Sequence, residues 1–199
     1  MKYVNQLEYP HWLYVTRTEM EDEKEREKGK TTTVRSSGCG LCSAVMVAHR
    51  LIPNCEFELR DALDLSYVVE ANYRRGTNYA RFAPAFAEKL DLKLESSRDI
   101  EDLRRCLRTG GAAVILVRGD RDGKVGLFTH GAHYMAVIGE EPDGRFAILD
   151  PALSDKKYKE EGRVGKVEIT KHGIVLSEAE HLIEEAHVTS MPYYLFWRQ

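Results

Sequence analysis

The chain has 199 residues, of which 43% are apolar and 31% charged, with a formal net charge of −3. This length fits one domain with a substantial core, and the composition is that of a soluble globular protein. The slightly negative charge argues against a nucleic-acid partner or an anionic membrane surface, and no apolar stretch is long enough to span a membrane.

The N-terminus and the cysteines indicate a cellular compartment. Residues 1–6 lack the apolar core of a secretory signal peptide, so we expect a cytoplasmic protein. Four cysteines in a chain of this length do not make a disulfide scaffold. Cys55 and Cys106 are most simply small buried hydrophobic residues, which leaves Cys39 and Cys42 to be explained.

The N-terminal half of the chain is predicted to be mainly helical. We expect the aromatic-rich residues 1–16 to pack on the domain, and the charged stretch 18–30 to be a solvated surface insertion. Beyond it, apolar residues recur at helical spacing. They predict a buried helix from Leu41 to about Ile52, then helices at 59–74, 82–90 and 99–108, with a short strand at 92–95.

The C-terminal half is predicted to be mainly extended. Continuous apolar runs predict strands at 112–117, 133–139 and 145–150, and the turn signal Pro142-Asp143-Gly144 joins the last two into an antiparallel hairpin. Further extended segments are expected at 165–170 and 193–197, with a helix near 177–186. Helices followed by an antiparallel sheet are the α+β pattern. No repeat or linker divides the chain, so we expect one domain over residues 1–199.

Cys39 stands where a cysteine becomes reactive. It lies between Gly38 and Gly40, directly before the apolar run that predicts the buried helix. The unpaired backbone N–H groups and the positive end of the helix dipole favour thiolate over thiol at such a position. The sequence therefore predicts a nucleophilic cysteine at a helix N-terminus.

Three motifs in order resemble the C39-like group of papain-like cysteine peptidases. They are Gly38-Cys39-Gly40 opening an apolar helix, the strand that runs from Gly131 to Gly139 through His133, and Ile148-Leu149-Asp150-Pro151-Ala152. The resemblance covers most of the chain. It implies a papain-like fold in which a helical half, with the nucleophile at the N-terminus of a buried helix, packs on an antiparallel β-sheet half.

The resemblance also implies catalytic roles. Cys39 corresponds to the nucleophile, His133 to the general base and acid, and Asp150 to the residue that orients the imidazole. In an antiparallel hairpin the start of one strand lies beside the end of its partner, so His133 and Asp150 are expected to be neighbours. Gln6 corresponds to the side chain that stabilises the oxyanion together with the N–H of Cys39.

The implied function is that of a cysteine peptidase or related thiol-dependent amide hydrolase, which acts through a covalent thioester on a peptide or other amide. It requires no cofactor or metal. The sequence departs from the family pattern in two places. Leu41-Cys42 replaces the usual Pro-Thr or Pro-Ser, and the charged stretch lengthens the separation between Gln6 and Cys39.

Other functions use the same residues. A papain-like fold without turnover would be a peptide-binding module. Cys39-Gly-Leu-Cys42 is a Cys-x-x-Cys sequence, typical of thiol oxidoreductases. Cys39 and Cys42 together with His130 and His133 also have the paired spacing of zinc ligands. His130 is close enough in sequence to His133 to serve as a substitute base or a residue at the rim of the site. The sequence does not predict an oligomeric state.

Overall fold

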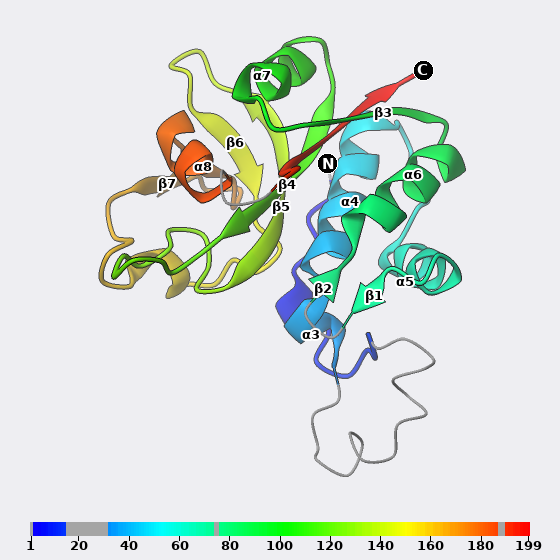
Figure 1. Cartoon of the computed structure of the whole chain (residues 1–199), viewed down its shortest axis with the longest axis horizontal. Helices are drawn as coiled ribbons and strands as arrows, with labels where there is room; N and C mark the ends of the chain where they lie inside the picture. The colour runs from blue at the N-terminus through cyan, green and yellow to red at the C-terminus, as the bar shows by residue number, and fades with distance from the viewer. Residues whose placement is uncertain (1, 15–31, 74–75, 187–189) are drawn as a thin grey trace.

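A helical half and a sheet half lie side by side in the structure, a computed structural model that describes residues 2–14, 32–73, 76–186 and 190–199 (Figure 1). The helical half contains η1 (Gln6–Glu8), α3 (Val34–Ser37), α4 (Cys39–Leu51), α5 (Leu59–Val68) and α6 (Tyr79–Lys89). The charged stretch at 18–30, predicted as a surface insertion, lies outside the described residues.

Helix α4 is the centre of the helical half. Every residue from Cys39 to Ala48 is buried, because α5 covers one side of the helix and the strands of the sheet cover another. An apolar run without a polar stripe is stable only when it is enclosed in this way. The predicted buried helix is confirmed.

The second half is an antiparallel sheet of seven strands in the order β3-β9-β4-β5-β6-β8-β7. The strands are β3 (Leu92–Ser97), β4 (Ala112–Arg118), β5 (Ala132–Glu140), β6 (Phe146–Leu149), β7 (Val167–Ile169), β8 (Val175–Ser177) and β9 (Tyr193–Arg198). As predicted, the Pro142–Gly144 turn joins β5 to β6, and Gly144 takes the positive φ of +88° that a glycine allows.

The sheet separates two apolar clusters. On one face, residues such as Val114 of β4 and Ala136 of β5 pack against α4. On the other face, Ile115 and Met135 pack in a second cluster with α7 (Ile100–Arg108) and α8 (Ala179–Ala186). Because β4 and β5 are covered on both faces, their sequences are continuous apolar runs rather than alternating ones.

One predicted helix is too long. The helix expected at 59–74 ends at Val68, and a short hairpin of β1 (Asn72–Tyr73) and β2 (Gly76–Thr77) follows it. Glu70 adopts a left-handed conformation with φ of +52°, which stops the helix. The helical spacing of apolar residues on which the prediction rested ends at Val68, which is exposed and adds nothing to the core.

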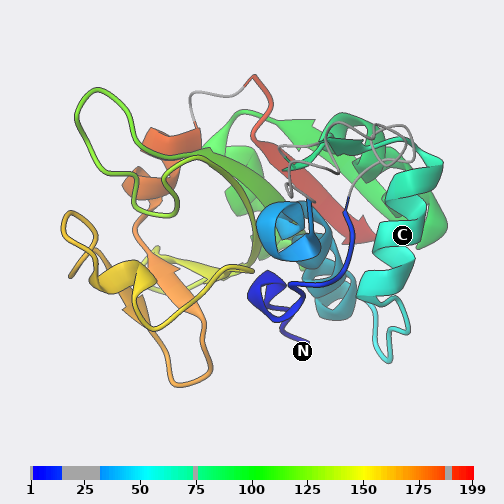
Figure 2. The same cartoon turned by 90° about the horizontal axis from the view of Figure 1, so that it is seen from below.

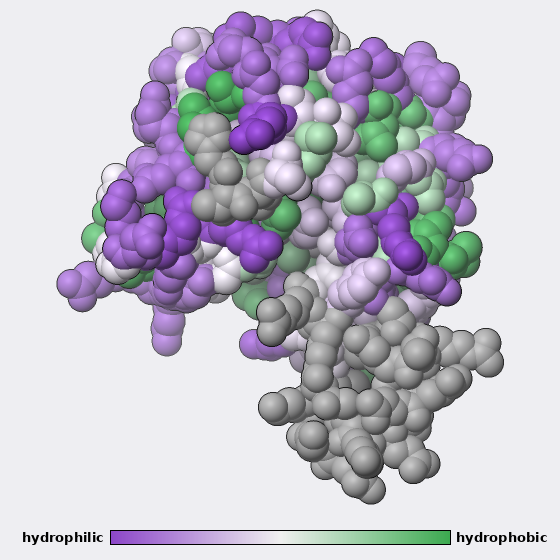
Figure 3. All heavy atoms as spheres, viewed as in Figure 1, coloured by the Kyte–Doolittle hydropathy of each residue, from purple (hydrophilic) through white to green (hydrophobic). Residues whose placement is uncertain are grey.

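One face of the molecule is mostly polar. On the face seen in Figure 3, hydrophilic residues predominate and apolar residues form small separate areas among them. In the part of the chain that the structure describes, no helix combines the length and the apolar character needed to cross a membrane.

Candidate functional site

Cys39 is the first residue of α4, and close packing requires the glycines on both sides of it. Gly38 ends α3 and begins α4, and a Cβ atom there would lie 2.6 Å from Cγ1 of Val34. A Cβ atom on Gly40 would lie 2.8 Å from Oγ1 of Thr77 in β2. The glycines therefore let two helices and the β1–β2 hairpin approach the backbone around the cysteine.

The surroundings of Cys39 favour its thiolate. Burial by itself raises the pKa of this thiol, but the hydrogen bond and the charge of His133 lower it, as do the main-chain N–H groups of Tyr134 and Gly40. The net result is a pKa below the ordinary value. Cys39 is buried, so the ionisation of its thiol is set by groups in α4 and at the start of β5.

His133 and Asp150 meet at one end of the β5–β6 hairpin. His133 is the second residue of β5, and Asp150 directly follows β6. The antiparallel register brings the two side chains together, and His133 Nε2 lies 2.8 Å from Oδ1 of Asp150. Both side chains are buried. With Nε2 bonded to Asp150, the second ring nitrogen is the one left for Cys39, whose thiol pKa is lowered by His133.

The pKa of His133 is shifted in the direction opposite to that of Cys39. Burial and the charge of Lys157 lower the pKa of His133, but Asp150 and Cys39 outweigh them and leave it raised. Burial raises the pKa of Asp150, whereas Lys157 and His133 hold it well below the usual carboxyl range. A thiol pKa that is lowered beside an imidazole pKa that is raised favours a thiolate–imidazolium pair.

Two residues that the sequence pattern does not single out form polar contacts with Asp150. Lys157 Nζ lies 2.5 Å from Oδ2 of Asp150, and the hydroxyl of Tyr158 donates to the same oxygen at 2.7 Å. The N–H of Ala152 donates to Oδ1 at 2.9 Å. The only sequence signal was an aromatic residue, Tyr158, within an otherwise charged stretch at 155–161.

The short helix η1, which contains Gln6, lies between the end of β6 and α3 (Figure 2). The main-chain N–H of Gln6 donates to the carbonyl of Pro151 at 2.7 Å, and its side-chain Nε2 donates to the carbonyl of Arg35 at 2.7 Å. The side chain is buried, and its Oε1 has no hydrogen-bond partner among the residues that the structure describes. The chain thus returns to this region in α3, although residues 15–31 separate Gln6 from it in sequence.

Cys42 and His130 have surroundings unlike those of Cys39 and His133. Cys42 is fully buried, and burial together with the nearby Cys39 raises the pKa of its thiol well above the ordinary value. His130 is exposed, with Nδ1 2.9 Å from Asp120 and Nε2 3.1 Å from Glu160. Within residues 2–14, 32–73, 76–186 and 190–199, no three His, Cys, Asp or Glu side chains are grouped so that they could hold a metal ion.

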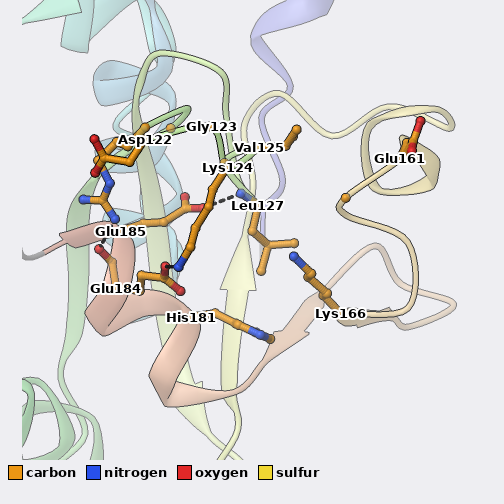
Figure 4. Close-up of a pocket in the computed structure, with 14 residues that line it drawn as sticks. Asp122, Gly123, Lys124, Val125, Leu127, Glu161, Lys166, His181, Glu184 and Glu185 are labelled. Carbon is orange, nitrogen blue, oxygen red and sulfur yellow. Dashed lines mark hydrogen bonds and ion pairs between the residues drawn. The ribbon is translucent and has the colours of Figure 1, made fainter.

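A separate cavity of about 760 Å³ opens beside α8 (Figure 4). Its lining residues come from the segments around 121–127 and 161–166 and from α8, and Cys39, His133 and Asp150 are not among them. Charges of both signs line it and partly neutralise one another, as in the 3.0 Å ion pair between Lys124 and Glu184. The cavity is thus distinct from the cluster around Cys39.

No protein-family model matches this sequence, and no curated protein is similar to it in sequence. The structure is similar to the crystal structure of a C39-like peptidase from Bacillus anthracis, with a TM-score of 0.53 and 12% identity over 81% of this chain and 89% of the other. It is also similar to the peptidase domain of Streptococcus ComA, a bifunctional ABC transporter involved in a quorum-sensing pathway. That match has a TM-score of 0.50 and 15% identity over 81% of this chain and 91% of the domain.

At these identities the likeness concerns the fold. The helical half with α4 at its centre and the antiparallel sheet match the expectation drawn from the three sequence motifs. This chain has the α+β, papain-like fold of the C39-like peptidases.

Proposed function

We propose that this chain is a cysteine peptidase or a related thiol-dependent amide hydrolase, with Cys39, His133 and Asp150 as its catalytic triad. The observation that carries the proposal is the buried His133–Asp150 hydrogen bond of 2.8 Å at the end of the β5–β6 hairpin, with Cys39 at the start of α4 close enough for His133 to lower its pKa. The directions of the pKa shifts in Cys39 and His133 agree with it. So does the likeness of the fold to two peptidases.

In the first half of the reaction, the thiolate of Cys39 attacks the carbonyl carbon of an amide. A C–S bond forms, and the π electrons of the carbonyl move onto its oxygen. The imidazolium of His133 then gives its proton to the amide nitrogen, the C–N bond breaks, and the amine leaves. The product on the enzyme is a thioester of Cys39 with His133 neutral.

In the second half, water replaces the amine. Neutral His133 takes a proton from water while the oxygen attacks the thioester carbonyl. The C–S bond breaks, the carboxylic acid leaves, and the thiolate–imidazolium pair is restored. Asp150 keeps one tautomer and one orientation of the imidazole in both halves, because it accepts the hydrogen bond from Nε2.

The oxyanion requires hydrogen-bond donors, and we assign them to Gln6 and the N–H of Cys39. A carboxamide nitrogen carries two hydrogens. One hydrogen of Gln6 Nε2 bonds to the carbonyl of Arg35, which fixes the side chain and leaves the second hydrogen for the substrate oxygen. The proposal covers residues 1–199 as one domain and takes peptides or other amides as the substrate class.

The first test is the pH dependence of alkylation at Cys39 by iodoacetamide, followed by peptide mapping. An unperturbed thiol titrates near about 8.5. We expect Cys39 to react well below that pH in the wild type, and the effect to disappear in His133→Ala. His130→Ala is the matched control, since its histidine is exposed and paired with Asp120 and Glu160, and it should behave as the wild type.

Hydrolysis itself is tested with a peptide library in ¹⁸O-labelled water. The proposal predicts one ¹⁸O atom in each new carboxylate, and no product from Cys39→Ala. If the alkylation rate of Cys39 follows the pH dependence of an unperturbed thiol and no peptide is cleaved, the triad is not functional. A catalytically inactive peptide-binding module would then be the better interpretation, and bound peptides would be recovered intact from the same library.

A further inference from the structure

Two cations share the one carboxylate of Asp150. Imidazole Nε2 of His133 faces Oδ1 at 2.8 Å, and the ammonium of Lys157 faces Oδ2 at 2.5 Å. The hydroxyl of Tyr158 adds a hydrogen bond to Oδ2 at 2.7 Å. When His133 is protonated, the carboxylate of Asp150 therefore faces two positive charges in a buried place, and the thiolate of Cys39 on the other side of the imidazole is the second negative charge. This arrangement goes beyond what orienting an imidazole requires.

The position of Lys157 is specifically built. Lysine is rarely buried unless it is paired, and Lys157 is only 8% exposed, whereas Lys156 and Lys159 beside it are exposed. Its carbonyl accepts a hydrogen bond from Nη1 of Arg163 at 3.4 Å. Arg163 is itself buried, and its Nε donates to the carbonyl of Gly126 at 2.7 Å. The hydrogen bonds of Arg163 thus hold the backbone of Lys157 in place, in addition to the contact of its ammonium with Asp150.

We propose that Lys157 is a positioning residue for the triad: it holds Oδ2 of Asp150 so that Oδ1 faces His133, and its charge limits how strongly the imidazolium is stabilised. This inference rests on the proposed function. A general acid and base works best when it can both give up and accept its proton. A buried carboxylate alone would hold the imidazolium proton too firmly, and the ammonium at its other oxygen weakens that hold.

The electrostatics of His133 agree with this role. Among the described residues, the ionisable groups that act on it most strongly are Cys39 at the start of α4, Asp150 after β6, and Lys157 in η2 (Lys157–Lys159). Burial and Lys157 lower the pKa of His133, and Asp150 and Cys39 raise it. Removing the ammonium while Asp150 stays in place should therefore raise the pKa of His133 further.

The test is an NMR titration of the imidazole of His133 in the full-length chain, assigned by the signal that disappears in His133→Gln. In Lys157→Met we expect the titration to move to higher pH than in the wild type. Lys157→Arg, which keeps a positive charge, should titrate close to the wild type. Lys156→Met removes an exposed lysine next to it in sequence and serves as the matched control.

A merely structural role gives a different result. It predicts that Lys157→Met lowers the free energy of unfolding but leaves the titration of His133 in the folded protein unchanged, or moves it to lower pH, and either outcome overturns the inference. If Lys157→Met does not fold, Lys157→Gln keeps a hydrogen-bond donor toward Asp150 without the charge. The same upward shift is then expected, and its absence is equally decisive.

Failure of this inference is distinguishable from failure of the proposed function. The alkylation profile of Cys39 in wild type and His133→Ala tests the triad without reference to Lys157. If that dependence on His133 is present but Lys157→Met leaves the titration unchanged, only the role of Lys157 is wrong. If the dependence on His133 is absent, the triad itself is wrong, and with it the inference.

Discussion

Replacing Asp150 by Asn should destabilise the fold as well as slow the reaction. The carboxylate is fully buried and accepts from His133 at 2.8 Å, Lys157 at 2.5 Å, Tyr158 at 2.7 Å and Ala152 at 2.9 Å. Asparagine has nearly the same shape, but its one side-chain oxygen can accept either from His133 and Ala152 or from Lys157 and Tyr158, and not from both pairs. Its amide nitrogen is a donor that faces other donors, and the ammonium of Lys157 loses its counter-charge.

Removing one partner of a buried ion pair costs about 3–5 kcal/mol, because the remaining charge is left unpaired. We expect Asp150→Asn to lose about this much of the free energy of unfolding at pH 7, measured by urea denaturation. The double variant Asp150→Asn/Lys157→Met removes both charges and should recover part of the loss. Asp155→Asn, at an exposed position nearby, is the control and should change little.

Two results would refute this reasoning. One is a loss below about 1 kcal/mol in Asp150→Asn, within the range of a single neutral hydrogen bond. The other is a double variant less stable than Asp150→Asn alone, since the buried ammonium would then not be the source of the destabilisation.

Three further outcomes are expected. The pKa of Asp150 is lower in the folded chain than the unfolded value of about 3.9. The carboxylate therefore contributes its full stabilisation above about pH 3.9, and this stabilisation is lost as the pH falls further. Between pH 5 and 2, the free energy of unfolding measured by urea denaturation should fall more steeply in the wild type than in Asp150→Asn. Gly40→Ala places a methyl group 2.8 Å from the hydroxyl oxygen of Thr77 in β2 and should lower the free energy of unfolding by roughly 1–3 kcal/mol. Gly131→Ala, where a methyl group meets open space, is the control and should lower it far less in thermal unfolding. Cys42→Ser should leave the alkylation profile of Cys39 unchanged, and a loss of reactivity would instead support the Cys-x-x-Cys redox pair.

The sequence predicts those parts of the fold that follow from local patterns. The apolar run after Cys39 predicts α4, and the Pro142–Gly144 turn predicts the β5–β6 hairpin; both are confirmed. The position of β9 between β3 and β4 has no local signal, because it depends on pairing between residues about a hundred positions apart. The early end of α5 depends on the left-handed backbone at Glu70, a residue type that ordinarily continues a helix.

The candidate site divides in the same way. His133 and Asp150 stand at the ends of two predicted strands, so their proximity could be anticipated from hairpin geometry. The expectation that Cys39 faces them came from the family resemblance, and the catalytic roles of all three residues stay a prediction. Lys157 could not be found from sequence. It lies in the stretch Asp-Lys-Lys-Tyr-Lys-Glu-Glu at 155–161, where three lysines look alike and the pattern indicates a solvated surface. Only the tertiary structure distinguishes the one that turns inward.

The position of β9 also bears on how the protein is made. β9 pairs with β3 on one side and with β4 on the other, so it is the strand that joins the segment leaving the helical half to the rest of the sheet. A ribosome synthesises β3 and β4 about 80 to 100 residues before β9, and until then each presents an unpaired edge. The sheet therefore cannot be completed before Tyr193–Arg198 have left the exit tunnel, and until then the edges of β3 and β4 are open to pairing with other strands.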